Sequence, residues 1–344
     1  MNGTAPGGGL PLASIDIGSH TIRLLSAILG PGERLFPMLS QRHITRLARG
    51  FQPDENLEES AIRDSLSVLS HYAGMLKSHG IRSVCCGATG VVRRARNRSA
   101  FLKAIEDFTG LRVDILSESR EAYLSAKGTL SVLPSHSGLT LSFDLGGSST
   151  EFLLVDGDEN DVLWSTSIFT GAATLTERHL SENHLPTEAL PIARTAVRSL
   201  LEPAISTLGT LARRRGKSLG ALRIVGTAGT VSTLAAMFLQ MPVYDPDRVN
   251  GLVLTSPWVD ATVQLLAGMP PALRRELPGL EEGREDIILG GALIVQEILA
   301  SLHREEFTVT DGGLLEGILL DLAEREMGWP QRLLSPLTWE TRKR

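Results

Sequence analysis

Two stretches of the chain repeat one pattern, SIDIGSHTIRLLS at residues 14–26 and SFDLGGSSTEFLLV at residues 142–155. Each is an apolar, β-prone run with one aspartate, then a short turn rich in glycine and hydroxyl groups, then a second apolar run. This pattern is typical of two strands joined by a tight polar turn. Asp16 and Asp144 occupy the same place in the two stretches. The repeat predicts two similarly folded halves whose turns can face one another across a cleft.

Strand and helix patterns alternate in both halves. Helical periodicity covers residues 55–79, a second helix is predicted at about 97–108, and Ser117 is placed to cap a third. In the second half, residues 221–239 and 307–326 each have the pattern of a strand, a glycine-rich loop and a helix. These patterns predict an α/β fold with mixed sheets.

The domain boundaries follow from this order. A chain of 344 residues is longer than one hydrophobic core usually serves, so two domains are expected. Residues 1–11 are predicted to be disordered, 12–135 to form the first domain and 136–312 the second, with a hinge near 135. A helix at about 313–330 is expected to return to the first domain.

Composition excludes several partners and locations. Hydrophobic residues make up 42% and charged residues 21%, as in a soluble globular protein. The net charge of −5 argues against a nucleic-acid or acidic-membrane partner. The apolar stretch at 287–295 is too short to span a membrane, and the N-terminus lacks the pattern of a secretory signal. Adjacent Cys85 and Cys86 predict buried thiols in a reducing compartment, so we expect a cytoplasmic protein.

The glycine-rich turns predict anion binding, because backbone N–H groups converge where no Cβ blocks the approach. Residues 18–21 and 146–149 are matched turns, and GTAGT at 226–230 begins a helix whose N-terminus favours anions. Asp144 and Glu151 flank the second turn, where carboxylate oxygens would suit Mg²⁺.

Other features add local charge or remove competing motifs. Two groups of arginines supply positive charge: Arg42, Arg46 and Arg49, and Arg93, Arg94, Arg96 and Arg98. The sequence Gly216-Lys217-Ser218 resembles the end of a P-loop, but Leu211 stands in the place of the first glycine. No HExxH, paired CxxC or G-x-S-x-G motif is present.

Together these motifs resemble the exopolyphosphatase and guanosine pentaphosphate phosphohydrolase (Ppx/GppA) family, from about residue 12 to 326. The two repeated stretches are similar to the family's first and second phosphate motifs. Further similar segments follow in the family's order: GATGVVRRARN (87–97), ILSESREAYLSAKG (115–128), IVGTAGTVSTLAAM (224–237), LPGLEEGREDIILGG (277–291) and VTDGGLLEG (309–317). The resemblance implies two ribonuclease H-like domains with an interdomain cleft, as in the actin, Hsp70 and sugar-kinase superfamily.

The resemblance also implies a function, metal-assisted hydrolysis that releases terminal phosphate from inorganic polyphosphate or guanosine pentaphosphate. Glu121 matches the family's catalytic glutamate, the implied general base. Asp144 and Glu151 would hold Mg²⁺ or another divalent cation. The residues expected to bind phosphate oxygens are Gly18, Ser19, His20, Thr21, Arg93, Gly146, Gly147, Ser148, Ser149 and Gly229.

Five positions differ from the family pattern. His20 replaces an asparagine, Glu118 a glycine, Arg120 an acid, Ser148 a glycine and Leu315 an arginine. Glu118 and Glu121 are three residues apart, so Glu118 is an alternative base.

Two other functions stay open at this stage. One is an ATP-dependent kinase or ATPase of the same superfamily, and the other is a regulatory protein that binds polyphosphate or guanosine alarmones without hydrolysing them. The sequence does not separate the two phosphate substrates, and it leaves a homodimer open.

Overall fold

Each repeated stretch folds as an antiparallel pair of strands. In the first, β1 (Leu10–Ile17) pairs with β2 (Thr21–Gly30). In the second, β6 (Leu139–Leu145) pairs with β7 (Thr150–Asp156). The two turns are therefore residues 18–20 and 146–149; Thr21, predicted in the first turn, is the first residue of β2.

The computed structural model describes residues 9–51, 55–134, 137–182 and 185–340. Contacts divide the chain into two compact units. Unit 1 runs to Val132 and resumes at Gly312, and unit 2 is Leu133–Asp311. The predicted hinge near 135 falls on residues 135–136, outside the described residues.

Unit 1 contains a sheet with the strand order β12-β3-β2-β1-β4-β5. β1, β2 and β3 are antiparallel neighbours, whereas β4 is parallel to β1 and β5 is parallel to β4. The other elements of this unit are β3 (Arg34–Ile44), α1 (Glu59–Ser78), β4 (Ser83–Ala88), α2 (Gly90–Arg94), α3 (Arg98–Thr109), β5 (Val113–Ile115), α4 (Glu118–Ser131), α12 (Leu314–Glu326) and β12 (Thr338–Trp339).

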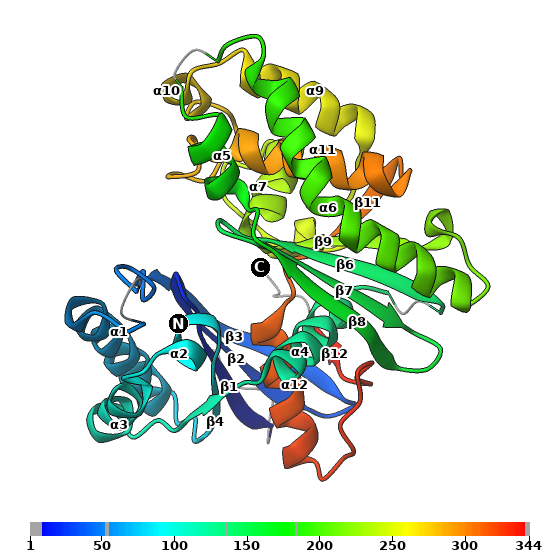
Figure 1. Ribbon diagram of the computed structural model, residues 1–344. Helices are drawn as coiled ribbons and strands as arrows, with labels where there is room; N and C mark the ends of the chain where they lie inside the picture. Colours follow the sequence, from blue (N-terminus) through cyan, green and yellow to red (C-terminus); the bar gives the residue numbers. More distant parts are fainter. Residues whose placement is uncertain (1–8, 52–54, 135–136, 183–184, 341–344) are drawn as a thin grey trace. The chain divides into compact units, whose positions relative to one another are not determined.

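Unit 2 contains a sheet with the order β10-β11-β9-β6-β7-β8. Its other elements are β8 (Asp161–Ile168), α5 (Ala172–His179), α6 (Ala189–Arg214), the short 3₁₀ helix Leu219–Ala221, β9 (Arg223–Thr227), α7 (Ala228–Phe238), α8 (Pro246–Val249), β10 (Val253–Thr255), α9 (Ser256–Ala267), α10 (Pro271–Arg274), α11 (Ile288–Leu302) and β11 (Glu306–Val309). The order β8-β7-β6-β9-β11 has the same strand directions as β3-β2-β1-β4-β5. The α/β fold with two related halves is thus confirmed (Figure 1).

Both faces of the unit 1 sheet are covered, because successive residues of a strand point to opposite faces. Ile15 and Ile17 of β1 join a core with α1 and α3. Leu12 packs instead in a cluster with α12, and Ser14 Oγ donates to the carbonyl of Leu315 at 2.8 Å. Asp16, two residues after Ser14, therefore lies on the α12 side of the sheet. Covering on both faces explains why β1 is almost continuously apolar.

The unit 2 core forms on one face of its sheet. Phe143 and Phe152, opposite one another on β6 and β7, join α5, α6, α7, α9 and α11 in this core. Asp144 and Glu151 are the next opposite pair, so they lie on the other face.

Two predicted segments differ from the structure or lie partly outside the described residues. The disordered N-terminus was expected over 1–11, of which 1–8 lie outside the described residues. Leu10 and Pro11 belong to β1, because they pair with Leu29 and Ile28 of β2. The C-terminal helix, expected at about 313–330, spans Leu314–Glu326 and ends before Gly328, whose φ is 68°.

Two expectations from composition can be compared with the described structure. Cys85 and Cys86 are both free thiols; Cys86 is buried and Cys85 is partly buried. No helix among the described residues has the length and apolar character needed to cross a membrane.

Candidate active site

The first turn, residues 18–21, is held through its carbonyl groups. The N–H of Gly18 donates to the carbonyl of Thr21 at 3.0 Å, and the segment after β3 donates two N–H groups to the carbonyl of His20. Ser19 Oγ accepts the N–H of Val91 on α2 at 3.2 Å. The turn is thereby fixed from its carbonyl side and joined to α2.

Arg93 of α2 contacts Glu121 in the first turn of α4. Its Nη1 donates to Glu121 Oε2 at 2.8 Å and to the carbonyl of Leu116 at 2.8 Å. The Glu121 side chain is 31% exposed, so water can reach it. Ser19, Arg93 and Glu121, three of the predicted site residues, are therefore brought together by α2.

The structure distinguishes Glu121 from Glu118, the alternative base. Glu118 Oε1 lies 3.7 Å from Arg93 Nη2, and its side chain is 88% exposed. Two neighbouring arginines of the basic run, Arg94 and Arg96, pair with Glu55 instead. Arg93 and Glu121 thus form the closer and less exposed contact.

Asp16 adds a second carboxylate to this group. Its Oδ1 is buried and has no hydrogen-bond partner among the described residues. Burial raises the pKa of Asp16 from 3.8 to about 6; Arg23 lowers this pKa, whereas Glu121 and Glu316 raise it. Glu121 in the first turn of α4 and Glu316 in the first turn of α12 therefore lie close enough to influence Asp16.

In the sequence analysis Asp16 is only aligned with Asp144, and no role is predicted for it. Its cross-strand neighbour in β2 is Arg23, whereas the equivalent neighbour of Asp144 in β7 is Glu151. At this position of the repeat, the first half has the basic residue Arg23 and the second half has the acidic residue Glu151. The alignment of Asp16 with Asp144 was the available signal for this second carboxylate.

Asp144 and Glu151 lie directly opposite each other on β6 and β7, so their side chains share one face of the sheet. Ser167 of β8, the next residue in this row, donates its Oγ to Glu151 Oε1 at 2.8 Å. Among the described residues, no group of three or more His, Cys, Asp and Glu side chains is placed to hold a metal ion. Two carboxylates nevertheless fit Mg²⁺, which commonly takes one or two from the protein and completes its shell with water and substrate phosphate.

The second turn, residues 146–149, is docked on the N-terminus of α5. The carbonyl of Gly146 accepts the N–H of Ala172 at 3.0 Å, and the carbonyl of Gly147 accepts two further N–H groups of α5. A Cβ at Gly171 would lie 2.6 Å from the carbonyl carbon of Gly147, so this contact requires glycine. The N–H groups of Gly147 and Ser148 donate to no group in the described part of the chain. They are available to phosphate oxygens.

The third predicted element is the start of α7. Thr227, at the end of β9, is the parallel neighbour of Asp144. Ala228 then adopts a φ of 75°, a left-handed conformation that costs alanine about 1 kcal/mol or more. A Cβ at Gly229 would lie 2.0 Å from Arg284 Nη2, so glycine admits a guanidinium over the first turn of α7. Sequence reasoning missed Arg284, which Glu281 holds through an ion pair.

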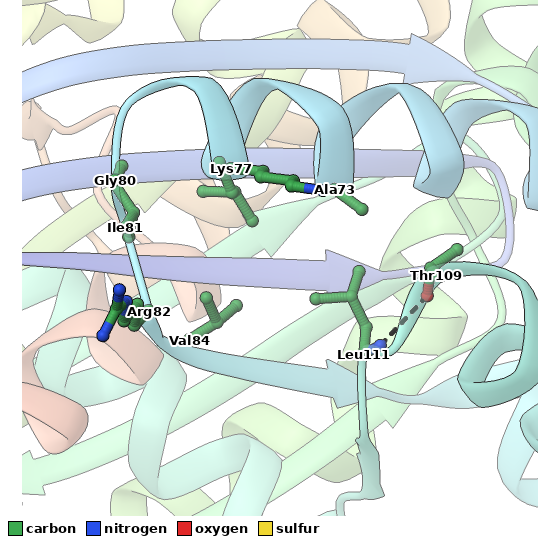
Figure 2. Close-up of a pocket in the computed structure, with 9 residues that line it drawn as sticks. Ala73, Lys77, Gly80, Ile81, Arg82, Val84, Thr109 and Leu111 are labelled. Atoms are coloured by element: carbon green, nitrogen blue, oxygen red, sulfur yellow. Dashed lines mark hydrogen bonds between the residues drawn. The ribbon is translucent and has the colours of Figure 1, made fainter.

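A cavity of about 420 Å³ in unit 1 is lined by none of the predicted site residues. Figure 2 shows its lining, in which apolar Ile81, Val84 and Leu111 stand beside Lys77 and Arg82. Its lining includes the residues just before β4 and β5 and Val84, the second residue of β4, whereas the turn at 18–21 follows the end of β1, which is parallel to β4. The cavity therefore lies at the amino end of these strands, and ligands of open α/β sheets bind at the carboxyl ends.

A model of the Ppx/GppA phosphatase family matches residues 30–326. The chain belongs to the Ppx/GppA family. Exopolyphosphatase 2 of Mycobacterium tuberculosis is similar, at 32% identity over 91% of this chain and 98% of that protein. A guanosine-5'-triphosphate,3'-diphosphate pyrophosphatase of Photobacterium profundum is 25% identical over 91% of this chain, which spans only 59% of that protein.

A crystal structure of the Aquifex aeolicus Ppx/GppA family member is similar to the whole chain. The identity is 27% with a TM-score of 0.79, covering 94% of this chain and 100% of that one. The predicted family is therefore confirmed, and with it the predicted enzyme class, phosphoanhydride hydrolases. The Ppx/GppA match from 30 to 326 includes Arg93, Glu121, Asp144, Glu151 and Gly229.

Proposed function

We propose that this Ppx/GppA protein hydrolyses terminal phosphate from inorganic polyphosphate, guanosine pentaphosphate or both, with Glu121 as the general base. The observation that carries the proposal is the 2.8 Å contact between Glu121 Oε2 and Arg93 Nη1. It joins the expected base to α2, which also contacts the turn at 18–21 through Ser19 and Val91. A base, a cation and donor groups for phosphate oxygens are the parts that phosphoryl transfer to water requires.

The chemistry assigned to unit 1 is proton transfer and charge neutralisation. Glu121 accepts a proton from water as the water oxygen forms its bond to the terminal phosphorus. The bridging P–O bond breaks, and the products are inorganic phosphate and a chain one phosphate shorter. Arg93 fixes the carboxylate through Oε2 and neutralises phosphate charge. Donor groups of the turn at 18–21 orient phosphate oxygens.

The chemistry assigned to unit 2 is binding of a divalent cation and phosphate. Asp144 and Glu151 are the proposed ligands of Mg²⁺, and the hydrogen bond from Ser167 orients Glu151. When bound, the cation would neutralise phosphate charge and orient the substrate. The N–H groups of the turn at 146–149 and of the first turn of α7, near Gly229, are assigned to phosphate oxygens.

Two relatives support the two candidate substrates to different degrees. The Mycobacterium protein is named exopolyphosphatase, and the chain matches nearly its whole length. The Photobacterium protein is named for a guanosine substrate, and the chain spans little more than half of it. Inorganic polyphosphate is therefore the first substrate to test.

The test measures phosphate release from polyphosphate and from guanosine pentaphosphate, with Mg²⁺ and with excess EDTA. We expect Glu121→Gln to lower kcat by roughly 10²–10⁴-fold. Glu118→Gln is the matched control, because Glu118 lies one turn away and is largely exposed; this variant should keep most of its turnover. Full activity of Glu121→Gln would remove Glu121 from the mechanism. A folded wild-type protein that binds either substrate without releasing phosphate would instead support the regulatory alternative.

A further inference from the structure

Helices α4 and α12 pack so closely that their backbones touch. A Cβ at Gly317 of α12 would lie 1.8 Å from the carbonyl oxygen of Leu124 in α4. A Cβ at Gly128 of α4 would lie 1.8 Å from the carbonyl oxygen of Gly313. Figure 1 shows the two helices side by side over one face of the unit 1 sheet. Glycine at these positions makes α4 and α12 a single packed layer.

Two ion pairs cross between the helices, one on each side of Leu124 along α4. Lys127 pairs with Glu324, and both side chains are fully buried. Nearer the start of α4, Arg120 Nη2 lies 2.7 Å from Asp321 Oδ1, and the Asp321 side chain is only 5% exposed. A buried carboxylate needs a cation or hydrogen-bond donors nearby, and two guanidinium groups serve Asp321. Arg120 faces Oδ1 as an ion pair without hydrogen-bond geometry, and Arg325 Nε lies 3.5 Å from Oδ2.

Gln331, beyond the end of α12, completes the contact. Its amide oxygen accepts from Arg120 Nη2 at 3.2 Å, and its amide nitrogen donates to Asp321 Oδ2 at 3.1 Å. The three side chains therefore form a closed ring of contacts. Such a ring restricts Arg120 more than a single exposed ion pair would.

This ring is attached to the turn of α4 that carries Glu121. The first turn of a helix lacks intrahelical partners for its N–H groups and is the part most prone to open. Ser117 caps this turn by accepting the N–H of Arg120 at 3.2 Å. We propose that Arg120 is a positioning residue: its pairing with Asp321 anchors the first turn of α4 to α12 and so fixes Glu121 for proton transfer. The inference rests on the proposed role of Glu121.

The proposal also accounts for one departure from the family pattern. An acid at position 120 would place a second carboxylate beside the buried carboxylate of Asp321. Like charges at such a distance repel strongly where water is excluded. Arg120 and Asp321 therefore form a matched pair in this chain, and the arginine need not signal lost activity.

The test uses the full chain and three variants, Arg120→Gln, Arg120→Lys and the control Lys103→Gln. Lys103 lies on α3 and pairs with Asp107 in an exposed ion pair, so its loss should change neither turnover nor helix opening. For Arg120→Gln we expect kcat to fall about 10-fold to 100-fold with KM nearly unchanged, as for a misplaced catalytic group. Arg120→Lys keeps the positive charge and should recover most of the loss.

A second measurement, amide hydrogen exchange of the peptide that contains Glu121, needs no activity. Exchange should be faster in Arg120→Gln than in wild type, whereas exchange in α3 should not change. Faster exchange in Arg120→Gln, together with a wild-type protein that releases no phosphate, would support the anchor and refute the proposed function. Equal exchange rates in Arg120→Gln and wild type would overturn the proposed anchor, whether or not the wild-type protein is active. Faster exchange with unchanged kcat would show that Arg120 stabilises the helix without positioning the base.

Discussion

Asp16→Asn should make the protein more stable at neutral pH. The buried Oδ1 of Asp16 has no hydrogen-bond partner among the described residues, and burial raises the pKa of this carboxyl from 3.8 to about 6. At pH 7.5 Asp16 is ionised in both the folded and the unfolded state. Ionisation is harder in the folded state, so it destabilises the fold. Asparagine has nearly the same shape and carries no charge.

The magnitude follows from the size of the pKa shift. A rise from 3.8 to about 6 corresponds to about 3 kcal/mol at pH 7.5, since one pKa unit is about 1.4 kcal/mol. The folded state binds the extra proton between these two pKa values, so wild-type stability falls as the pH rises through this window. The stabilisation by Asp16→Asn should therefore be about half as large at pH 5 and should nearly vanish below about pH 4.

Calorimetric unfolding at pH 4.5, 5.5 and 7.5 measures this effect. A gain of about 3 kcal/mol should raise the unfolding temperature of unit 1 by roughly 6–12 °C at the highest pH. Asp107→Asn is the control, because Asp107 is exposed and its carboxylate pairs with Lys103. A stabilisation of Asp16→Asn that is absent, or equal at all three pH values, would refute the reasoning. Higher stability together with lost turnover would identify Asp16 as part of the functional site.

Four further substitutions, one of them a control, test the packing of unit 1 by chemical unfolding. Gly317→Ala should destabilise the protein by several kcal/mol, since its Cβ would meet a carbonyl oxygen of α4. Gly74→Ala is the control: a Cβ at this position of α1 meets open space, so the variant should be more stable by about 0.5–1 kcal/mol. Equal effects of the two alanines would contradict the close packing of α4 and α12. Lys127→Met should cost about 3–5 kcal/mol, because it leaves Glu324 charged and buried; a neutral result would mean that Glu324 takes up a proton or finds water. Ser117→Ala should cost about 1 kcal/mol through the lost helix cap, and no change would show that the cap is dispensable.

Local patterns in the sequence were sufficient for much of the fold. The apolar, β-prone runs on either side of each polar turn predicted both strand pairs, because a tight turn between two such runs is typical of a hairpin. Ser117 was correctly predicted as the cap of α4, because a hydroxyl before a helical run meets the free N–H groups of the first turn. The segment from Ala189 to Arg214, the long helix α6, carried no motif and was not predicted.

The candidate site was predictable where its residues are close in sequence or matched by the family. Asp144 and Glu151 flank one turn, so their cross-strand pairing follows from the hairpin itself. The resemblance favoured Glu121 over Glu118, but spacing did not separate them, because both are in the first turn of α4. The contacts of Arg93 separate the two in the structure.

The sequence alone determined the repeat, the strand–turn–strand units and the residue types that phosphate chemistry needs, since these depend on neighbours along the chain. Tertiary structure decided which distant side chains meet. Arg120 reaches Asp321 and Asp16 lies near Glu316 because α12, from the end of the chain, packs against β1 and α4. Burial likewise decided the raised pKa of Asp16, because desolvation depends on every group that surrounds the carboxylate and not on its own sequence.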